Sequence, residues 1–423
     1  MTSAQNEEDL VAYRLRARRW LADNAPRAGS GDADRRGTEQ AWLDGRRFQS
    51  AQNAAGLSGI TWPKSYGGQG LTPAHQAVFN EEAEAYELPS NLFQITLAIL
   101  GMTLLDHGSE AQKQRYLPEM LRGESLWVQL LSEPGAGSDL AAVRTQAVRD
   151  GDEWVLNGQK GWSSYAQWSD YSLVLARTDW DVPKHAGLTV FIMPLEAPGV
   201  TIRPLRQISG EDEFCEEFLD DVRLPADAVV GTVNRGWSVT LSMFKHSRDM
   251  TGGAGAGPTF DRSRGGDPDP GRDLIDFVLN AGHAADHHVR RLVAELVADN
   301  VVSGLLATRV SQLGRQPDAN PAWGTMAKVF GAATLQRRRE IELEVRAETT
   351  MAWRGDMEDG GAPLHDYLWA RTATVAGGTH EVNNNTIGER ILGLPAEAAV
   401  DRDRPFREVI RAAETAGARP RAN

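Results

Sequence analysis

The chain is predicted to be an α+β protein in which a β-rich part lies between two helical parts. Apolar residues recur at helical spacing up to about residue 125. From Trp127 onward, short β-rich runs alternate with Gly, Pro, Asn and Asp, and helical spacing resumes after residue 237. We therefore expect domains at 1–126, 127–232 and 233–423, since 423 residues allow two or three domains of roughly 100–200 residues each.

The helical parts show clear periodicity. The first predicted helix, 7–25, gathers its apolar side chains on one face, and further helices follow within 39–125. GITWPKSYGGQG (59–70) interrupts them with four glycines and a proline. A Gly- and Pro-rich stretch at 251–273 is expected to be a loop. Apolar stripes at 284–310 and 322–345 then predict two long helices through which the protein oligomerises.

The middle part is expected to be a β-sandwich or barrel. Its predicted strands are WVQLL, EWVLNGQKGW, YSLVLART, GLTVFIMPL and GVTIRPLRQI, each bounded by turn-forming residues.

Composition narrows the class of protein. Hydrophobic residues make up 41% of the chain, and the formal net charge of −13 argues against nucleic-acid and anionic-membrane partners. A single cysteine, Cys215, excludes an internal disulfide and a Cys-cluster metal site, so no metal is expected. No signal peptide and no apolar run of roughly 18 residues is evident. These features predict a cytoplasmic protein.

The stretch LLSEPGAGSDL (130–140) is the most specific motif in the chain. Gly135 and Gly137 permit tight turns that expose consecutive backbone N–H groups, and Ser132 and Ser138 add hydroxyls. Such a concavity suits a phosphate or a polar ring edge. A Gly-rich hairpin without any ligand is the alternative that this stretch alone leaves open.

A second motif, GQKGWSSYAQWSDYSLVLART (158–178), follows about twenty residues later. The indole of Trp162 could lie against a flat ring, and Ser164 is expected on the same strand face two residues on. The alternative is that Trp162 is an ordinary core residue.

Together these motifs resemble the acyl-CoA dehydrogenase family. The resemblance runs in order through GITWPKSYGGQG, LLSEPGAGSDL, LNGQKGW, GVTIRPLRQISGEDEF, DDVRLP, GTVNRGW, AGGTHEV and ERILGLP. It implies an N-terminal helical domain, a middle β-domain and a C-terminal four-helix bundle, with FAD held between the last two and a neighbouring subunit helping. It also implies a homo-oligomer or a heteromer with a related subunit, an acyl-CoA or acyl-carrier thioester as substrate, and an electron-transfer flavoprotein as possible partner.

The resemblance also assigns cofactor positions. The flavin ring is expected beside Gln129, Leu131 and Ser132, with Trp162 packed on its face and the Ser164 hydroxyl at the reactive nitrogen. The pyrophosphate is expected near Gly137 and Ser138. Thr379 and Glu381 match positions that contact the cofactor beside the C-terminal Gly-Thr.

The catalytic base of the family is missing. Its reaction removes a weakly acidic α-proton, which requires a carboxylate in a dry site where desolvation raises its pKa. The two positions that carry this glutamate in the family are here Gly377, in VAGGTHEV (375–382), and Ser247, in FKHSR (244–248). Restoring glutamate should raise proton exchange, and Gly377→Glu is the simpler trial provided that Gly377 does not need a positive φ.

Substitutes for the base are few. His246 lies next to Ser247, about 100° around the helix, and its imidazole could act as a base or could be structural. Asp249 and Glu381 are further candidates. Three functions remain open: an acyl-thioester oxidoreductase with an atypical base, a catalytically silent subunit paired with an active relative, and a fold repurposed for another flavin reaction.

Overall fold

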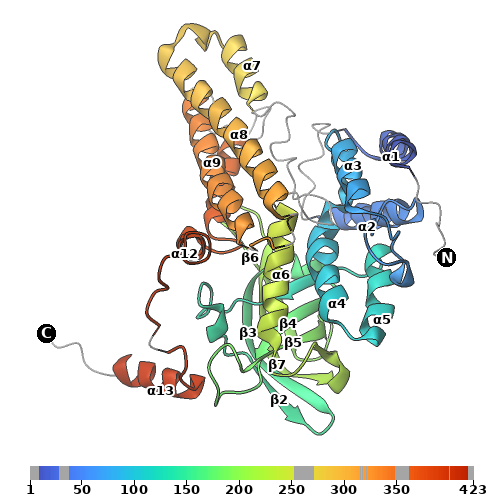
Figure 1. The fold of residues 1–423 in the computed structure, drawn as a ribbon, viewed down its shortest axis with the longest axis vertical. Helices are drawn as coiled ribbons and strands as arrows, with labels where there is room; N and C mark the ends of the chain where they lie inside the picture. The colour runs from blue at the N-terminus through green and yellow to red at the C-terminus, as the bar shows by residue number, and fades with distance from the viewer. Residues whose placement is uncertain are drawn as a thin grey trace, which may run out of the picture.

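The computed structural model describes residues 9–27, 38–251, 271–314, 316, 318–320, 322–347, 362–399 and 401–417. It confirms the predicted α+β class: helices, then a sheet, then helices, with the sheet at one end of an elongated molecule (Figure 1). The predicted loop 251–273 lies almost wholly outside the described residues.

The N-terminal helices are α1 (Leu10–Asn24), α2 (Glu39–Ala54), α3 (Pro73–Ala83), α4 (Met102–His107) and α5 (Glu110–Leu121). The apolar stretch before α4 is not one regular helix, because it forms a 3₁₀ turn, Pro89–Phe93, and a π-helical segment, Ile95–Gly101. At Gly101 the backbone passes against the Trp62 indole, where an added Cβ would lie 2.3 Å from a ring atom. Only glycine fits such an approach.

The middle sheet is mixed. Its strands are β1 (Trp127–Leu130), β2 (Gln146–Asp150), β3 (Glu153–Ser164), β4 (Tyr171–Arg177), β5 (Leu188–Pro194), β6 (Val200–Leu205), β7 (Phe214–Pro225) and β8 (Val229–Val230). The strand order is β6-β7-β3-β2-β4-β5-β8, with β1 paired to β4. β1 and β2 run parallel to β4, and the other pairings are antiparallel.

Strands β2, β7 and β8 were not predicted as strands. The side chains of β7 that point into the domain begin with Cys215, Glu217 and Leu219, all buried. A glutamate in that row breaks the alternation of apolar and polar residues by which a half-buried strand is recognised. Strand β7 nevertheless pairs with β3 along most of its length.

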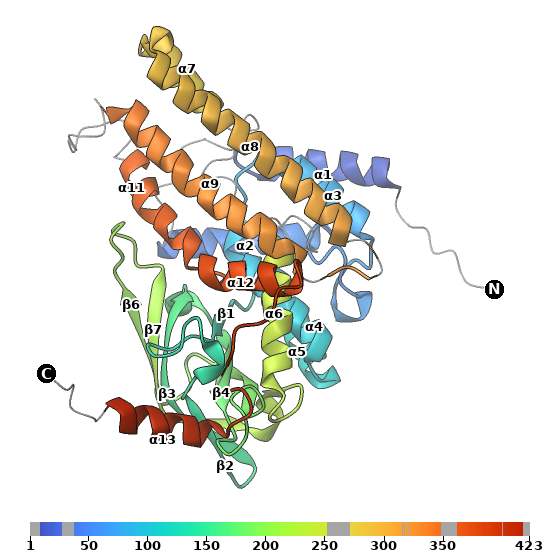
Figure 2. The ribbon, with the colours of Figure 1, turned by 60° about the vertical axis from the view of Figure 1, so that its left-hand side comes forward.

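The C-terminal helices are α6 (Gly236–Thr251), α7 (Arg272–Asn280), α8 (His287–Gly314), α9 (Trp323–Val345), α11 (Ala362–Trp369), α12 (His380–Arg390) and α13 (Phe406–Gly417). The two long predicted helices are α8 and α9, which lie side by side (Figures 1 and 2). Helix α13 returns to the middle domain, where Phe406 stacks on Trp180 and Arg407 pairs with Asp181 at 2.7 Å (Figure 2).

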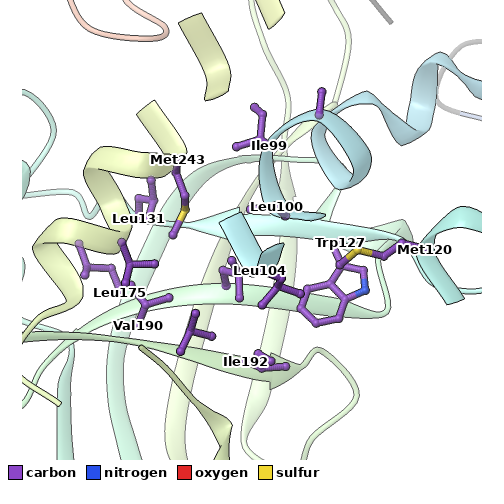
Figure 3. Packing of buried hydrophobic residues seen from close by; sticks show 14 of the residues in the cluster. Ile99, Leu100, Leu104, Met120, Trp127, Leu131, Leu175, Val190, Ile192 and Met243 are labelled. Carbon is purple, nitrogen blue, oxygen red and sulfur yellow. The ribbon is translucent and has the colours of Figure 1, made fainter. Parts of the chain in front are cut away.

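One hydrophobic core joins the three parts of the chain. Leu100 and Leu104 from the N-terminal helices, Leu175 and Val190 from the sheet, and Met243 from α6 all belong to it (Figure 3). Burying such side chains stabilises a fold by about 1.5–3 kcal/mol each. The seam between the sheet, α4 and α6 is therefore a firmly packed region. Among the described helices, none combines the length and apolar character needed to cross a membrane.

Candidate functional site

The predicted phosphate-binding stretch forms an open turn after β1. Glu133 and Ala136 exchange two backbone hydrogen bonds, of 3.2 and 3.0 Å, which close the turn. An added Cβ at Gly135 or Gly137 would meet no atom within 4 Å. The turn therefore leaves room above its backbone for another molecule.

The buried carboxylate of Glu133 anchors this turn to the rest of the domain. Glu133 accepts hydrogen bonds from the backbone N–H groups of Arg144 and Thr145, at 2.6 and 2.8 Å, and from Lys160 Nζ at 2.9 Å. Burial by itself raises the pKa of Glu133, but the Lys160 charge and these donors hold it below its ordinary value. Glu133 is thus an ionised anchor.

Lys160 ties β3 to the same segment. Its side chain is fully buried, and Nζ also donates to the Leu131 carbonyl at 2.9 Å. The neighbouring Gly161 N–H donates to the Ser132 carbonyl at 3.1 Å. Leu131 and Ser132 are therefore held against the end of β3 that carries Trp162.

Trp162 is displayed on the surface by a β-bulge. The β3–β7 register shifts between Gly161 and Ser163, and Trp162 adopts a left-handed φ of 65° with 64% of its surface exposed. A bulky residue in this conformation is uncommon and is often functional. Ser164 is half-buried, whereas Lys160 and Ser163 are buried.

These features fit a flat, phosphate-bearing cofactor. An exposed indole offers a stacking surface, and beside it Gly135, Gly137 and Gly161 leave space that a Cβ would fill. Gln129 lies on β1 opposite Leu173, and Ser138 is exposed at the open turn. Seven of the nine predicted cofactor residues thus come from β1, β3 and the turn that follows β1.

The other two, Thr379 and Glu381, lie at the start of α12. Thr379 Oγ1 accepts a hydrogen bond from the Val382 N–H at 3.3 Å and caps the helix. Bonds to its own backbone N–H and to the Thr379 side chain lower the pKa of exposed Glu381, which makes it a weaker base. Helix α12 packs against α9, which also contacts α6.

Gly377, one of the two base positions, requires a left-handed backbone. Its φ is +69°, and an added Cβ would lie 3.5 Å from Cε of Lys328. Burial lowers the pKa of Lys328, whose Nζ donates to the Ala373 carbonyl. The expectation that Gly377→Glu is the simpler trial is therefore corrected, because the backbone is strained for glutamate and a lysine faces the new side chain.

The other base position lies on α6. Ser247 is half-buried, and next to it buried His246 places Nε2 2.8 Å from Oδ2 of Asp106 on α4. Ser242 Oγ donates to the same oxygen at 2.8 Å. Burial raises the pKa of Asp106, but the bonds from His246 and Ser242 leave it lowered. The side chain of Asp249, another candidate, lies outside the described side chains.

The Asp106–His246 pair has two interpretations. A carboxylate that fixes an imidazole is the arrangement of many general bases. The same contact also joins α4 to α6, and it turns the ring toward α4.

Sequence reasoning missed Asp106 because no motif links positions 140 residues apart. It also missed Lys160 and Glu133, although alternation from Trp154 through Leu156 places position 160 inward.

Within the described ranges, no cluster of three or more His, Cys, Asp or Glu side chains could hold a metal ion.

Comparisons with known proteins find similarity in all three parts of the chain. Family models described as the acyl-CoA dehydrogenase N-terminal, middle and C-terminal domains match residues 7–124, 129–222 and 267–392. Acyl-CoA dehydrogenase IpdE1 of Mycobacterium tuberculosis is 35% identical over 399 residues, which cover 92% of this chain and 99% of that protein.

Two solved structures are similar in fold and sequence. The Tcur3481-Tcur3483 steroid ACAD superposes with a TM-score of 0.77 at 27% identity, covering 94% of this chain and 100% of that chain. The ChsE4-ChsE5 complex from Mycobacterium tuberculosis superposes with a TM-score of 0.72 at 28% identity, with the same two coverages.

Proposed function

Because this chain belongs to the acyl-CoA dehydrogenase family, we propose that it binds FAD and takes part in the α,β-dehydrogenation of an acyl thioester. The observation that carries this proposal is the exposed, left-handed Trp162 beside an open glycine turn. Members of the family bind FAD, and a strained aromatic residue with most of its surface in solvent is well explained by a planar ligand.

The proposed roles follow from the geometry. FAD, when bound, accepts the hydride that leaves the β-carbon. Trp162 supplies a stacking face, and Ser164 presents a hydroxyl beside it. Backbone N–H groups around Gly137 are available to the pyrophosphate. The buried Lys160–Glu133 pair holds the segment that carries Trp162 and Ser164 against the turn around Gly137.

Replacing Gly137 with leucine should remove bound FAD while the protein stays folded. The turn has no positive φ at this position and no neighbour within 4 Å of the new Cβ, so the side chain would collide only with a ligand. The measurement is flavin absorbance per mole of purified protein, alongside thermal melting. The matched control is Gly314→Leu at the end of α8, which is equally open. Unchanged flavin in Gly137→Leu would contradict the assignment.

We propose the Asp106–His246 pair as the atypical base. His246→Ala should then slow bleaching of the flavin by an acyl-CoA by about 10²–10⁴-fold, the usual contribution of a general base. Asp106→Asn should slow it less, because the imidazole remains but loses its orienting carboxylate. Ser242→Ala removes only the second bond to Asp106 and should leave the rate almost unchanged. The assignment fails if His246→Ala bleaches at the wild-type rate.

A second function is favoured by the two base positions themselves. Gly377 adopts a conformation unsuited to glutamate, and Ser247 carries no carboxylate. Among the similar structures, ChsE4-ChsE5 is a complex of two different chains. The chain could accordingly be a silent subunit that pairs with an active relative. In that case the chain alone retains flavin that no acyl-CoA bleaches, and bleaching starts only when the relative is co-expressed.

The substrate is proposed to be an acyl-CoA or an acyl-carrier thioester. Similarity to a steroid ACAD supports a bulky, steroid-derived acyl group.

We propose an electron-transfer flavoprotein as the electron acceptor and an oligomer built through α8 and α9. The apolar face of α8, with Val301, Val302 and Leu305 exposed, supports this assembly.

A further inference from the structure

A buried glutamate lies directly behind the bulge that displays Trp162. Glu217 on β7 has no exposed surface, and Ser163 Oγ donates a hydrogen bond to its Oε1. Its other oxygen, Oε2, has no hydrogen-bond partner. Buried polar atoms are normally satisfied, so an unpaired one requires an explanation.

Ser163 is a buried residue within a strained segment. Trp162 and Tyr165 on either side of the Ser163-Ser164 pair both adopt left-handed φ values, 65° and 62°. The Tyr165 N–H is held by the Glu213 carbonyl at 2.7 Å. On the Trp162 side, the bond from Ser163 to Glu217 is the side-chain anchor of the bulge.

The charges that face Glu217 are Lys160, across the β3–β7 pairing, and Glu216, its neighbour on β7. Burial raises the pKa of Glu217 to about 7, against the lowering effects of Ser163 and Lys160. The Ser163 hydrogen bond is among the effects that lower this pKa, so the bond is kept whether Glu217 is neutral or ionised.

We propose that Glu217 is a positioning residue for the flavin site, which fixes the Trp162 bulge by accepting the hydrogen bond of Ser163. This inference rests on the proposed function, because it assigns Trp162 to the flavin face. It predicts that FAD is held less tightly when either partner of this hydrogen bond is removed.

The test compares amide hydrogen exchange of residues 161–165 in the wild type and in variants of this hydrogen bond. Glu217→Gln keeps an acceptor for Ser163, so its protection should stay close to that of the wild type. Glu217→Leu and Ser163→Ala each remove one partner, and each should lose roughly tenfold in protection, the effect of one buried hydrogen bond.

The matched control is Glu216→Gln, because Glu216 is the adjacent carboxylate and bonds to Gln159 rather than to Ser163. It should retain the wild-type protection. A loss in Glu217→Gln as large as that in Glu217→Leu, or unchanged protection in Ser163→Ala, would overturn the inference.

Flavin retention measured on the same proteins separates the two proposals. Retention that follows protection across the variants supports both proposals. If protection behaves as expected but no variant binds FAD, the anchoring of the bulge is supported and the proposed flavin site is contradicted.

Discussion

In a His246→Ala background, replacing Ser247 with glutamate is expected to raise exchange of the α-proton of a bound acyl-CoA by about 10²–10⁴-fold, the contribution of a placed general base. Position 247 is half-buried on α6, and Met243 and Phe244 lie one turn away. Apolar neighbours disfavour the charged carboxylate and raise its pKa toward the range that proton abstraction requires. Exchange is followed as deuterium incorporation by mass spectrometry.

Gly377→Glu is the comparison for this experiment, and it should gain much less. The left-handed backbone costs a non-glycine residue about 1–2 kcal/mol, and Lys328 would hold the new carboxylate ionised and lower its pKa. A larger gain in Gly377→Glu than in Ser247→Glu would show that this account of the two positions is wrong.

Replacing Lys160 with methionine should destabilise the protein by about 3–5 kcal/mol, the usual cost of removing one partner from a buried ion pair. Lys160 is fully buried and pairs with Glu133 at 2.9 Å, so its loss leaves a buried carboxylate without its cation. The Leu131 carbonyl also loses its donor, and bound flavin should be lost with it. Urea unfolding measures the change.

Arg223→Met is the matched control in the same domain. Arg223 on β7 pairs with Asp150 and Glu153, but it is about half exposed, so solvent screens both pairs and the variant should unfold close to the wild type. Equal losses of stability in the two variants would contradict the claim that the buried ion pair of Lys160 stabilises this site.

The order of domains and the place of the glycine turn could be predicted because both depend on local pattern. A β-rich run bounded by turn-forming residues identified β3, and the glycines of LLSEPGAGSDL identified the turn that the structure shows as open at Gly137. Those signals are carried by neighbouring residues, so a single sequence contains them.

Features that depend on distant residues or on backbone conformation could not be predicted. Strand β7 was missed because Glu217 occupies its inward row. The left-handed backbone of Trp162 follows from a bulge whose register is set by pairing with β7. The contact of His246 with Asp106 joins α6 to α4, and no local sequence pattern predicts it.

The central claim is that FAD lies on the face of the middle domain that displays Trp162. A structure of the purified protein with FAD added, together with a related subunit if one is needed, tests it most directly. The account predicts the flavin ring against the Trp162 indole and beside the Ser164 hydroxyl, with the pyrophosphate at the turn around Gly137. FAD bound elsewhere on the chain, with Trp162 still open to solvent, would contradict it.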